Sequence, residues 1–260
     1  MTEPSTQQRW PDKLWIVRHG ESAGNVARDA AYAGGLLVID IAERDVDVPL
    51  SARGEEQATA LGEWFAQQPA DARPNVVLAS PYLRARQTAA LIESAGGIAT
   101  GATTLIDERL REKEFGVLDR LTKLGIEQRF PDQAALRARV GKFYFRPPGG
   151  ESWCDVILRL RSVLDSVSLH HNKAGTRVLI VAHQVIVLCL RYLIETMTED
   201  EILAIDREGE VANCGVTAYV LDHRASPAGA LRLKTYNFVA PLQAAGAPVT
   251  SRPDAPAGAK

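Results

Sequence analysis

The sequence predicts an α/β fold of three layers, in which helices cover both faces of a mainly parallel central sheet. Short β-branched runs alternate with longer amphipathic stretches, and this alternation is typical of a covered parallel sheet. The 260 residues are 46% hydrophobic and 24% charged, which suits one sizeable core. Because both ends are polar or rich in Pro, Ala and Gly, we expect a single domain over residues 12–241 with flexible tails at 1–11 and 242–260.

The spacing of apolar residues assigns each element of this domain. Runs of Val, Ile and Leu indicate strands, whereas apolar residues at the helical period indicate helices, as for Trp153, Val156 and Leu160. Thr198 and Glu201 have the spacing of a capping box and predict the start of a short helix. In chain order we expect a strand at 14–17, a helix at 51–68, a strand at 76–79, a helix at 83–94, a helix at 152–170, a strand at 177–182 followed by a helix, and strands at 216–221 and 231–238.

Residues 116–150 fit the alternation least well. Prolines and glycines surround two short amphipathic pieces in this stretch. We interpret it as a small helical insertion over one end of the sheet, above the site. Insertions at this place often act as lids, and an excursion that serves only packing is an equal alternative.

Charge and cysteine content exclude several classes of protein. The net charge of −2 provides no overall positive field for nucleic acid or an anionic membrane. Three cysteines without a CxxC pair favour a reducing compartment over a disulfide framework. The polar N-terminus lacks the features of a secretory signal, and the longest apolar run, at 178–190, is shorter than the ~20 residues that span a bilayer. We expect a soluble cytoplasmic protein, and the sequence favours no oligomeric state.

Cationic and nucleophilic side chains follow three predicted strands. Arg18 and His19 follow the first strand, Arg84 follows the strand at 76–79 after a short turn, and His183 follows the strand at 177–182. Ligands of open α/β folds bind where the carboxyl ends of the strands meet. The guanidinium fork suits phosphate oxygens, and a neutral imidazole can attack phosphorus. The sequence therefore predicts a phosphate site with a nucleophilic histidine.

An acidic stretch of the sequence has residue types that could bind a cation. We interpret Asp40, Glu43, Asp45 and Asp47 as a solvated loop rather than as cation ligands, and we predict no metal site in this chain.

Several short motifs occur in the order typical of one family. They resemble the histidine phosphatase superfamily, branch 1, which has the phosphoglycerate-mutase-like fold. Together the motifs extend over nearly all of the predicted domain. They are Arg18-His19-Gly20-Glu21-Ser22 with Asn25, Pro49-Leu50-Ser51 with Gly54 and Gln57-Ala58, Ser80-Pro81 with Arg84-Ala85 and Gln87-Thr88-Ala89, Glu112 with Phe115-Gly116, Gly149-Gly150-Glu151-Ser152, and Val181-Ala182-His183.

The resemblance implies catalysis through phosphohistidine without a metal or other cofactor. It implies that His19 is the nucleophile, that Glu112 is the proton donor, and that Arg18, Arg84 and His183 hold the phosphate. Asn25 and Ser22 occupy positions at which the family supplies further polar contacts. Gln184 stands where family members commonly have glycine, which predicts an additional side chain at the rim of the site.

Phosphomonoester hydrolysis of a small phosphorylated metabolite is the favoured function. One alternative is a phosphoglycerate mutase, which would use 2,3-bisphosphoglycerate as a cofactor. The basic residues of 116–150 are dispersed and do not form the second anion clamp that a mutase needs. A second alternative is a regulator that binds phosphate esters without catalysis. Such a protein would be expected to lack His19 or Glu112, and both are present.

Overall fold

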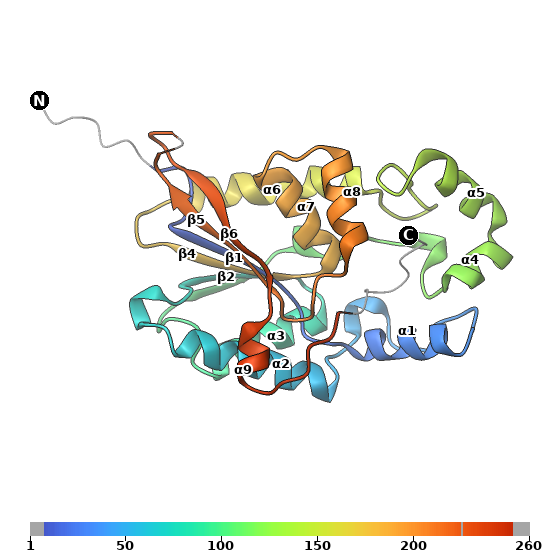
Figure 1. Cartoon of the computed structure of the whole chain (residues 1–260), viewed down its shortest axis with the longest axis horizontal. Coiled ribbons are helices and arrows are strands. Elements are labelled where there is room, and N and C mark those ends of the chain that lie inside the picture. Colours follow the sequence, from blue (N-terminus) through green and yellow to red (C-terminus); the bar gives the residue numbers. More distant parts are fainter. Residues whose placement is uncertain (1–7, 225, 252–260) are drawn as a thin grey trace, which may run out of the picture.

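One six-stranded sheet forms the centre of the computed structural model, which describes residues 8–224 and 226–251 (Figure 1). Its strands lie in the order β3-β2-β4-β1-β5-β6. β1, β2, β3 and β4 pair in parallel, and β5 is antiparallel to both of its neighbours, which confirms the predicted mainly parallel sheet. The strands are β1 (Lys13–Arg18), β2 (Val76–Ala79), β3 (Thr103–Ile106), β4 (Arg177–Ala182), β5 (Val216–Asp222) and β6 (Ala230–Phe238).

Helices cover both faces of this sheet (Figure 1). Alternate residues of β1 enter different cores, because Leu14 and Ile16 pack on the side of α6 and α7, whereas Trp15 and Val17 pack on the side of α2 and α3. The predicted three-layer arrangement is therefore confirmed. The helices are α1 (Ala23–Ala33), α2 (Ala52–Ala66), α3 (Leu83–Ser94), α4 (Lys123–Arg129), α5 (Pro131–Val140), α6 (Trp153–His170), α7 (Gln184–Ile194), α8 (Glu199–Glu208) and α9 (Ala240–Ala244).

Side-chain caps explain where several helices begin. The hydroxyl of Ser51 accepts from the amide of Gly54 at the start of α2. Thr198 and Glu201 form the predicted capping box of α8. The predicted strands at 76–79 and 177–182 and the predicted helix at 83–94 have the observed boundaries.

Two parts of the chain differ from the expectation. β3 was not predicted, since all four of its side chains are exposed at the sheet edge and show no alternation. The predicted tail from residue 242 is wrong for residues 242–251, because Leu242 is fully buried and Thr250 is 7% exposed. Residues 8–11 are also attached, through a bond from Arg9 N to Ala228 O. The rest of both predicted tails lies outside the described residues.

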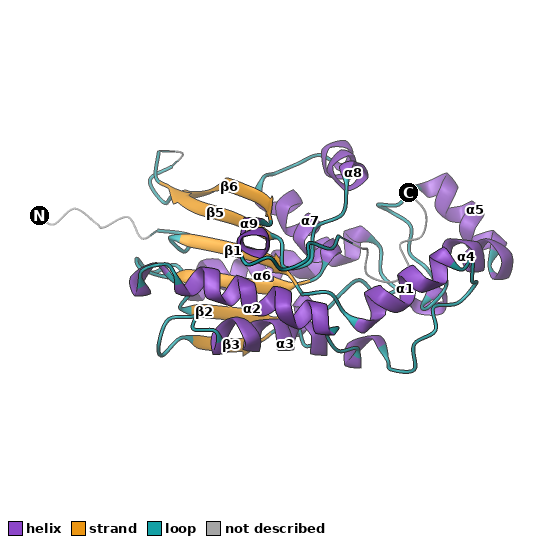
Figure 2. Cartoon of the chain, turned by 60° about the horizontal axis from the view of Figure 1, so that its bottom comes forward, coloured by secondary structure: helices purple, strands orange, loops and turns teal. Residues whose placement is uncertain are grey.

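Residues 116–150 form the predicted helical insertion. Figure 2 shows α4 and α5 beside α1 at one end of the molecule. The insertion has its own small apolar cluster, which includes Leu118, Ile126 and Phe145. It is attached to the chain after α1, where Thr122 N donates to Leu37 O. Its role as a lid stays a prediction.

None of the helices within 8–224 and 226–251 is long and apolar enough to cross a membrane.

Two glycines let the start of α2 approach the loop after β1. A Cβ atom at Gly54 would lie 1.9 Å from the carbonyl oxygen of Glu21, and one at Gly20 would lie 2.4 Å from the carbonyl oxygen of Gly54. The amide of Ser51 donates to the same Glu21 oxygen at 2.9 Å. The close approach therefore fixes the backbone immediately after His19.

We expect Gly54→Ala to lower the free energy of unfolding by roughly 1–3 kcal/mol, since the new methyl group overlaps backbone that cannot rotate away. Alanine's helix propensity, worth about 1 kcal/mol over glycine, opposes this loss but does not relieve the overlap. Urea unfolding measures the change. Gly209→Ala is the control, because a Cβ atom there meets nothing within 4 Å. Equal stability of the two variants would contradict the packing argument.

Candidate active site

His19 is the first residue after β1 and is fully buried. Its amide continues the sheet pairing by donating to Ala182 O at 2.9 Å. Its ring nitrogen Nδ1 lies 2.6 Å from Gly20 O. Because a carbonyl oxygen only accepts, Nδ1 carries the proton and Nε2 carries the lone pair. The loop thus holds the imidazole in the tautomer that a nucleophile at Nε2 requires.

Arg84, in the first turn of α3, faces this nitrogen. Its Nε donates to His19 Nε2 at 3.2 Å, and its side chain is 3% exposed. Its Nη1 donates to the carbonyl oxygen of Asp45 at 2.6 Å and to Oδ1 of the same residue at 2.9 Å. Asp45 therefore anchors one end of the guanidinium while the Nε side faces His19. The Asp45 side chain is 36% exposed, in keeping with the predicted solvated loop, but its bond to Arg84 was not predicted.

His183 and Ser80 occupy the same edge of the sheet. They follow β4 and β2, respectively, and His183 Nε2 lies 2.7 Å from Ser80 Oγ. The ring centroids of His183 and His19 are 5.1 Å apart. Tyr82 also packs against His183, with ring centroids 5.0 Å apart, and burial raises the pKa of Tyr82, so this phenol stays neutral.

Arg18 completes the set of cationic side chains at this edge. It is fully buried, and its Nη1 donates to Val211 O at 2.6 Å. Its own carbonyl oxygen accepts from Cys214 N at 3.0 Å. The structure therefore places Arg18, His19, Arg84 and His183 at the carboxyl ends of β1, β2 and β4, where the sequence predicted them.

Glu112 lies in the loop that follows β3. This loop starts at the same edge, because Asp107 N donates to Ala79 O at 2.9 Å. Glu112 is 1% exposed, and its Oε1 accepts from Lys113 N at 2.8 Å. The ammonium group of Lys113 lies 4.5 Å from the Phe115 ring centroid, and burial lowers the pKa of Lys113 to about 8. The predicted proton donor is thus a buried carboxyl group in a partly apolar setting.

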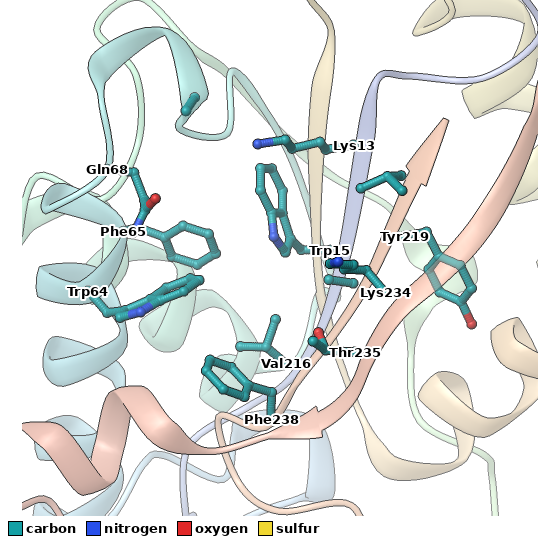
Figure 3. A pocket seen from close by; sticks show the side chains of 13 residues that line it. Lys13, Trp15, Trp64, Phe65, Gln68, Val216, Tyr219, Lys234, Thr235 and Phe238 are labelled. Atoms are coloured by element: carbon teal, nitrogen blue, oxygen red, sulfur yellow. The ribbon is translucent and has the colours of Figure 1, made fainter. Parts of the chain in front are cut away.

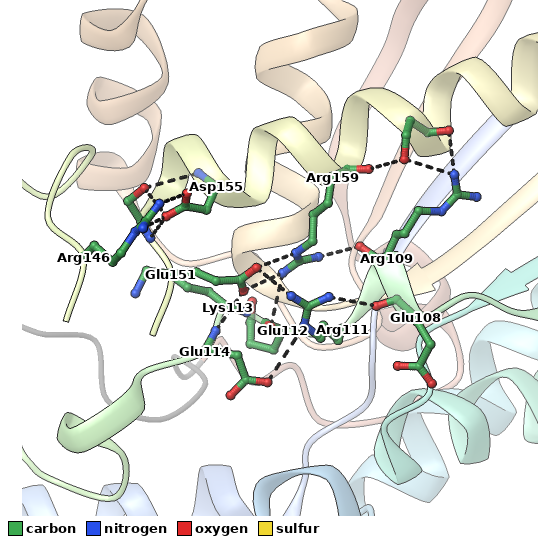
Figure 4. Close-up of polar contacts among 12 residues, drawn as sticks. Glu108, Arg109, Arg111, Glu112, Lys113, Glu114, Arg146, Glu151, Asp155 and Arg159 are labelled. Atoms are coloured by element: carbon green, nitrogen blue, oxygen red, sulfur yellow. Dashed lines mark hydrogen bonds and ion pairs between the residues drawn. The ribbon is translucent and has the colours of Figure 1, made fainter. Parts of the chain in front are cut away.

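A network of ion pairs holds the loop of Glu112 (Figure 4). Arg159 of α6 donates to Glu151 Oε1 at 2.9 Å and to Glu112 O at 3.3 Å. Arg111 donates to the same Glu151 oxygen at 2.8 Å, and Glu114 N donates to the other oxygen at 3.1 Å. Burial raises the pKa of Glu151, but the bond and charge of Arg159, the bond from Glu114 N and the charge of Arg111 together outweigh it, and the net shift is downward. Glu151 therefore stays charged and fixes the loop.

Sequence reasoning missed the roles of Arg159 and Arg111. Glu151 carried a signal, since it belongs to the Gly-Gly-Glu-Ser motif. No local pattern distinguishes Arg159 from the other arginines of its helix, because two of its partners, Arg109 O and Glu112 O, lie 50 and 47 residues away in the chain.

Ser22 and Asn25 act locally as a helix cap. Asn25 N donates to Ser22 Oγ at 3.2 Å, and Ser22 N donates to Asn25 Oδ1 at 2.9 Å. A phosphate contact from Asn25 would therefore use its side-chain N–H groups. Gln184 directly follows His183, and its amide donates to Glu210. That bond occupies one N–H of the side chain predicted at the rim.

No group of three or more metal-ligating side chains occurs among the described residues. A pocket of about 330 Å³ lies elsewhere, along α2 and the strands β1, β5 and β6 (Figure 3). Trp15, Trp64 and Phe238 line it. None of the predicted site residues contributes to this pocket, so it is separate from the candidate site.

Comparison with known proteins gives consistent results. The sequence profile of the histidine phosphatase superfamily (branch 1) matches residues 14–231. A probable phosphoglycerate mutase GpmB of Erwinia tasmaniensis is 31% identical over 218 residues, which is 83% of this chain and 86% of that protein. A 6-phosphofructo-2-kinase/fructose-2,6-bisphosphatase of Caenorhabditis elegans is 31% identical over 181 residues. That match includes 69% of this chain, but the chain spans only about a third (33%) of the length of that relative.

Solved structures agree with the fold. YhfR of Bacillus stearothermophilus superimposes with a TM-score of 0.67 at 24% identity, over 88% of this chain and 98% of that protein. A mycobacterial glucosyl-3-phosphoglycerate phosphatase superimposes with a TM-score of 0.65 at 25% identity, over 87% and 98%. The profile match and the GpmB relative extend over most of the folded region that carries the histidine and arginine cluster, and this chain belongs to the histidine phosphatase superfamily, branch 1.

Proposed function

We propose that this protein hydrolyses the phosphomonoester of a small phosphorylated metabolite through a phosphohistidine intermediate. The observation that carries the proposal is the pairing of His19 and Arg84. The Nδ1–H···O bond to Gly20 leaves the lone pair on Nε2, and the guanidinium Nε of Arg84 lies 3.2 Å from that nitrogen. A nucleophile and a donor for phosphate oxygens are thus adjacent.

In the first step, His19 Nε2 attacks phosphorus and the bond from phosphorus to the ester oxygen breaks. Arg18, Arg84 and His183 stabilise the negative charge on the nonbridging oxygens. Glu112 donates its proton to the departing alkoxide, so that an alcohol leaves. His19 then carries the phosphoryl group.

In the second step, water attacks the phosphorus of phosphohistidine. The Glu112 carboxylate takes a proton from this water, the bond from phosphorus to Nε2 breaks, and inorganic phosphate leaves. His19 and protonated Glu112 are then restored. This cycle needs neither a metal ion nor an organic cofactor.

The mutase alternative is supported by the similarity to the probable phosphoglycerate mutase GpmB. A mutase needs 2,3-bisphosphoglycerate and cations that hold a second anionic group. Two basic residues of 116–150 are already paired, because Lys142 contacts Asp206 and Arg146 contacts Asp155. Their pairing favours hydrolysis over transfer.

An assay of the purified chain on a panel of phosphomonoesters and 3-phosphoglycerate separates the two reactions. We expect release of inorganic phosphate that needs no 2,3-bisphosphoglycerate and that a chelator does not reduce. Formation of 2-phosphoglycerate that depends on the bisphosphate would favour the mutase. A requirement for metal would contradict the proposed mechanism.

We expect His19→Ala to lower the rate of hydrolysis by at least about 10⁴-fold, since the variant lacks the group that accepts the phosphoryl group. Mass spectrometry of acid-labile phosphate after a brief reaction should find phosphohistidine at residue 19 in the parent only. His170→Ala is the matched control, because His170 is exposed at the end of α6. Phosphorylation of another residue, or near-parental hydrolysis by His19→Ala, would refute this assignment.

For Glu112→Gln we expect a loss that depends on the leaving group. Hydrolysis of an alkyl phosphate should fall by about 10²–10⁴-fold, since the alkoxide must be protonated, whereas an activated aryl phosphate should lose much less. Glu108→Gln serves as the control, because that side chain is exposed in the same loop. An equal loss on both substrates would leave Glu112 with a positioning role only.

A further inference from the structure

The chain after β6 returns to the loop that carries His19, although it lies beyond the residues that match the superfamily profile. Leu242 of α9 is fully buried in the core shared with α2. Further along, Asn213 N donates to the carbonyl oxygen of Thr250 at 2.8 Å. The segment that ends at Thr250 is therefore part of the folded domain.

The hydroxyl group of Thr250 joins two buried side-chain amides. Gln57 Nε2 donates to Thr250 Oγ1 at 2.8 Å, and Thr250 Oγ1 donates to Asn213 Oδ1 at 3.0 Å. Both amide residues are fully buried. A hydroxyl group has one hydrogen and two lone pairs, so it can accept from one amide while it donates to the other.

The other end of each side-chain amide forms a hydrogen bond with the loop that carries His19. Asn213 Nδ2 donates to the carbonyl oxygen of His19 at 3.1 Å, and Gln57 Oε1 accepts from Glu21 N at 2.8 Å. These bonds hold the backbone on both sides of Gly20. The position of this backbone matters because the carbonyl oxygen of Gly20 accepts from His19 Nδ1 and so sets the tautomer of the ring.

We propose that Thr250 is a positioning residue for His19. An amide has one donor end and one acceptor end. The hydroxyl of Thr250 bonds the outer ends of both amides, and the carbonyl oxygen of Pro248 also accepts from Gln57 Nε2 at 2.8 Å, so these partners together support the orientation in which Gln57 and Asn213 face the loop. A flipped Asn213 would bring its oxygen against the carbonyl oxygen of His19, and a flipped Gln57 would bring its NH₂ against the amide of Glu21. The catalytic consequence rests on the proposed function, in which His19 is the nucleophile.

Thr250→Val tests this role with little change of shape, because valine replaces the hydroxyl with a methyl group. The backbone bond from Asn213 N to residue 250 is retained, so the segment should stay attached. We expect kcat for phosphomonoester hydrolysis to fall about tenfold, since small displacements of a reacting group are costly, and KM to change little. Thr250→Ser retains the hydroxyl and should restore kcat. Ser251→Ala, at an exposed neighbour, is the control.

Amide hydrogen exchange at Glu21 gives a readout that does not depend on activity. The amide of Glu21 should exchange faster in Thr250→Val than in the parent, Thr250→Ser and Ser251→Ala, because its acceptor Gln57 then loses one of the two partners of its Nε2 and keeps only Pro248 O. An unchanged exchange rate would overturn the proposal, as would an equal loss of kcat in Thr250→Ser. If the parent hydrolyses no phosphomonoester, the proposed function fails while the exchange experiment still tests the positioning of the loop.

Discussion

The candidate site depends on the register in which β1, β4 and β2 pair. Val17 lies beside Val181, and Val181 lies beside Ala79, so the three strands end at one level. A slip of one residue would exchange the two faces of a strand, and packing on both faces opposes it. His19 and His183 follow two of these strand ends directly, which brings their rings within 5.1 Å. The side chains of the site are therefore positioned by the packing of the apolar strands that lead to them.

Within that frame, fixed hydrogen bonds orient the reacting groups before any substrate arrives. Gly20 holds one nitrogen of His19, and Asp45 holds one end of the Arg84 guanidinium, so each group presents its remaining side to the other. With its proton on Nδ1, the imidazole keeps a lone pair on Nε2, with which it attacks phosphorus in the proposed mechanism. Preorganisation of this kind reduces the rearrangement needed in the transition state.

Much of the fold and the core of the site could be predicted because their signals are local. The run at 177–182 indicates a buried strand, and the residue after it is a site residue. β3 carried no such signal, since an edge strand with exposed side chains needs only backbone pairing. The roles of Asp45 and Thr250 depend on partners distant in the chain. Asp45 binds a residue of α3, and Thr250 binds Gln57, which lies 193 residues away. In the sequence, the residues around Asp45 resemble a solvated acidic loop, and the residues around Thr250 resemble a flexible tail.

Contacts between distant parts of the chain also connect the insertion with Arg84. Arg120 donates to the carbonyl oxygens of Ile41 and Glu43, at 2.9 and 2.6 Å, so the insertion is attached to the stretch that leads to Asp45. Asp45 in turn holds Arg84 at 2.9 Å. The insertion is therefore linked to the support of Arg84 through the hydrogen bonds of Arg120, the backbone of residues 43–45 and the bond from Arg84 to Asp45. This link is present whether the insertion opens as a lid or serves only packing.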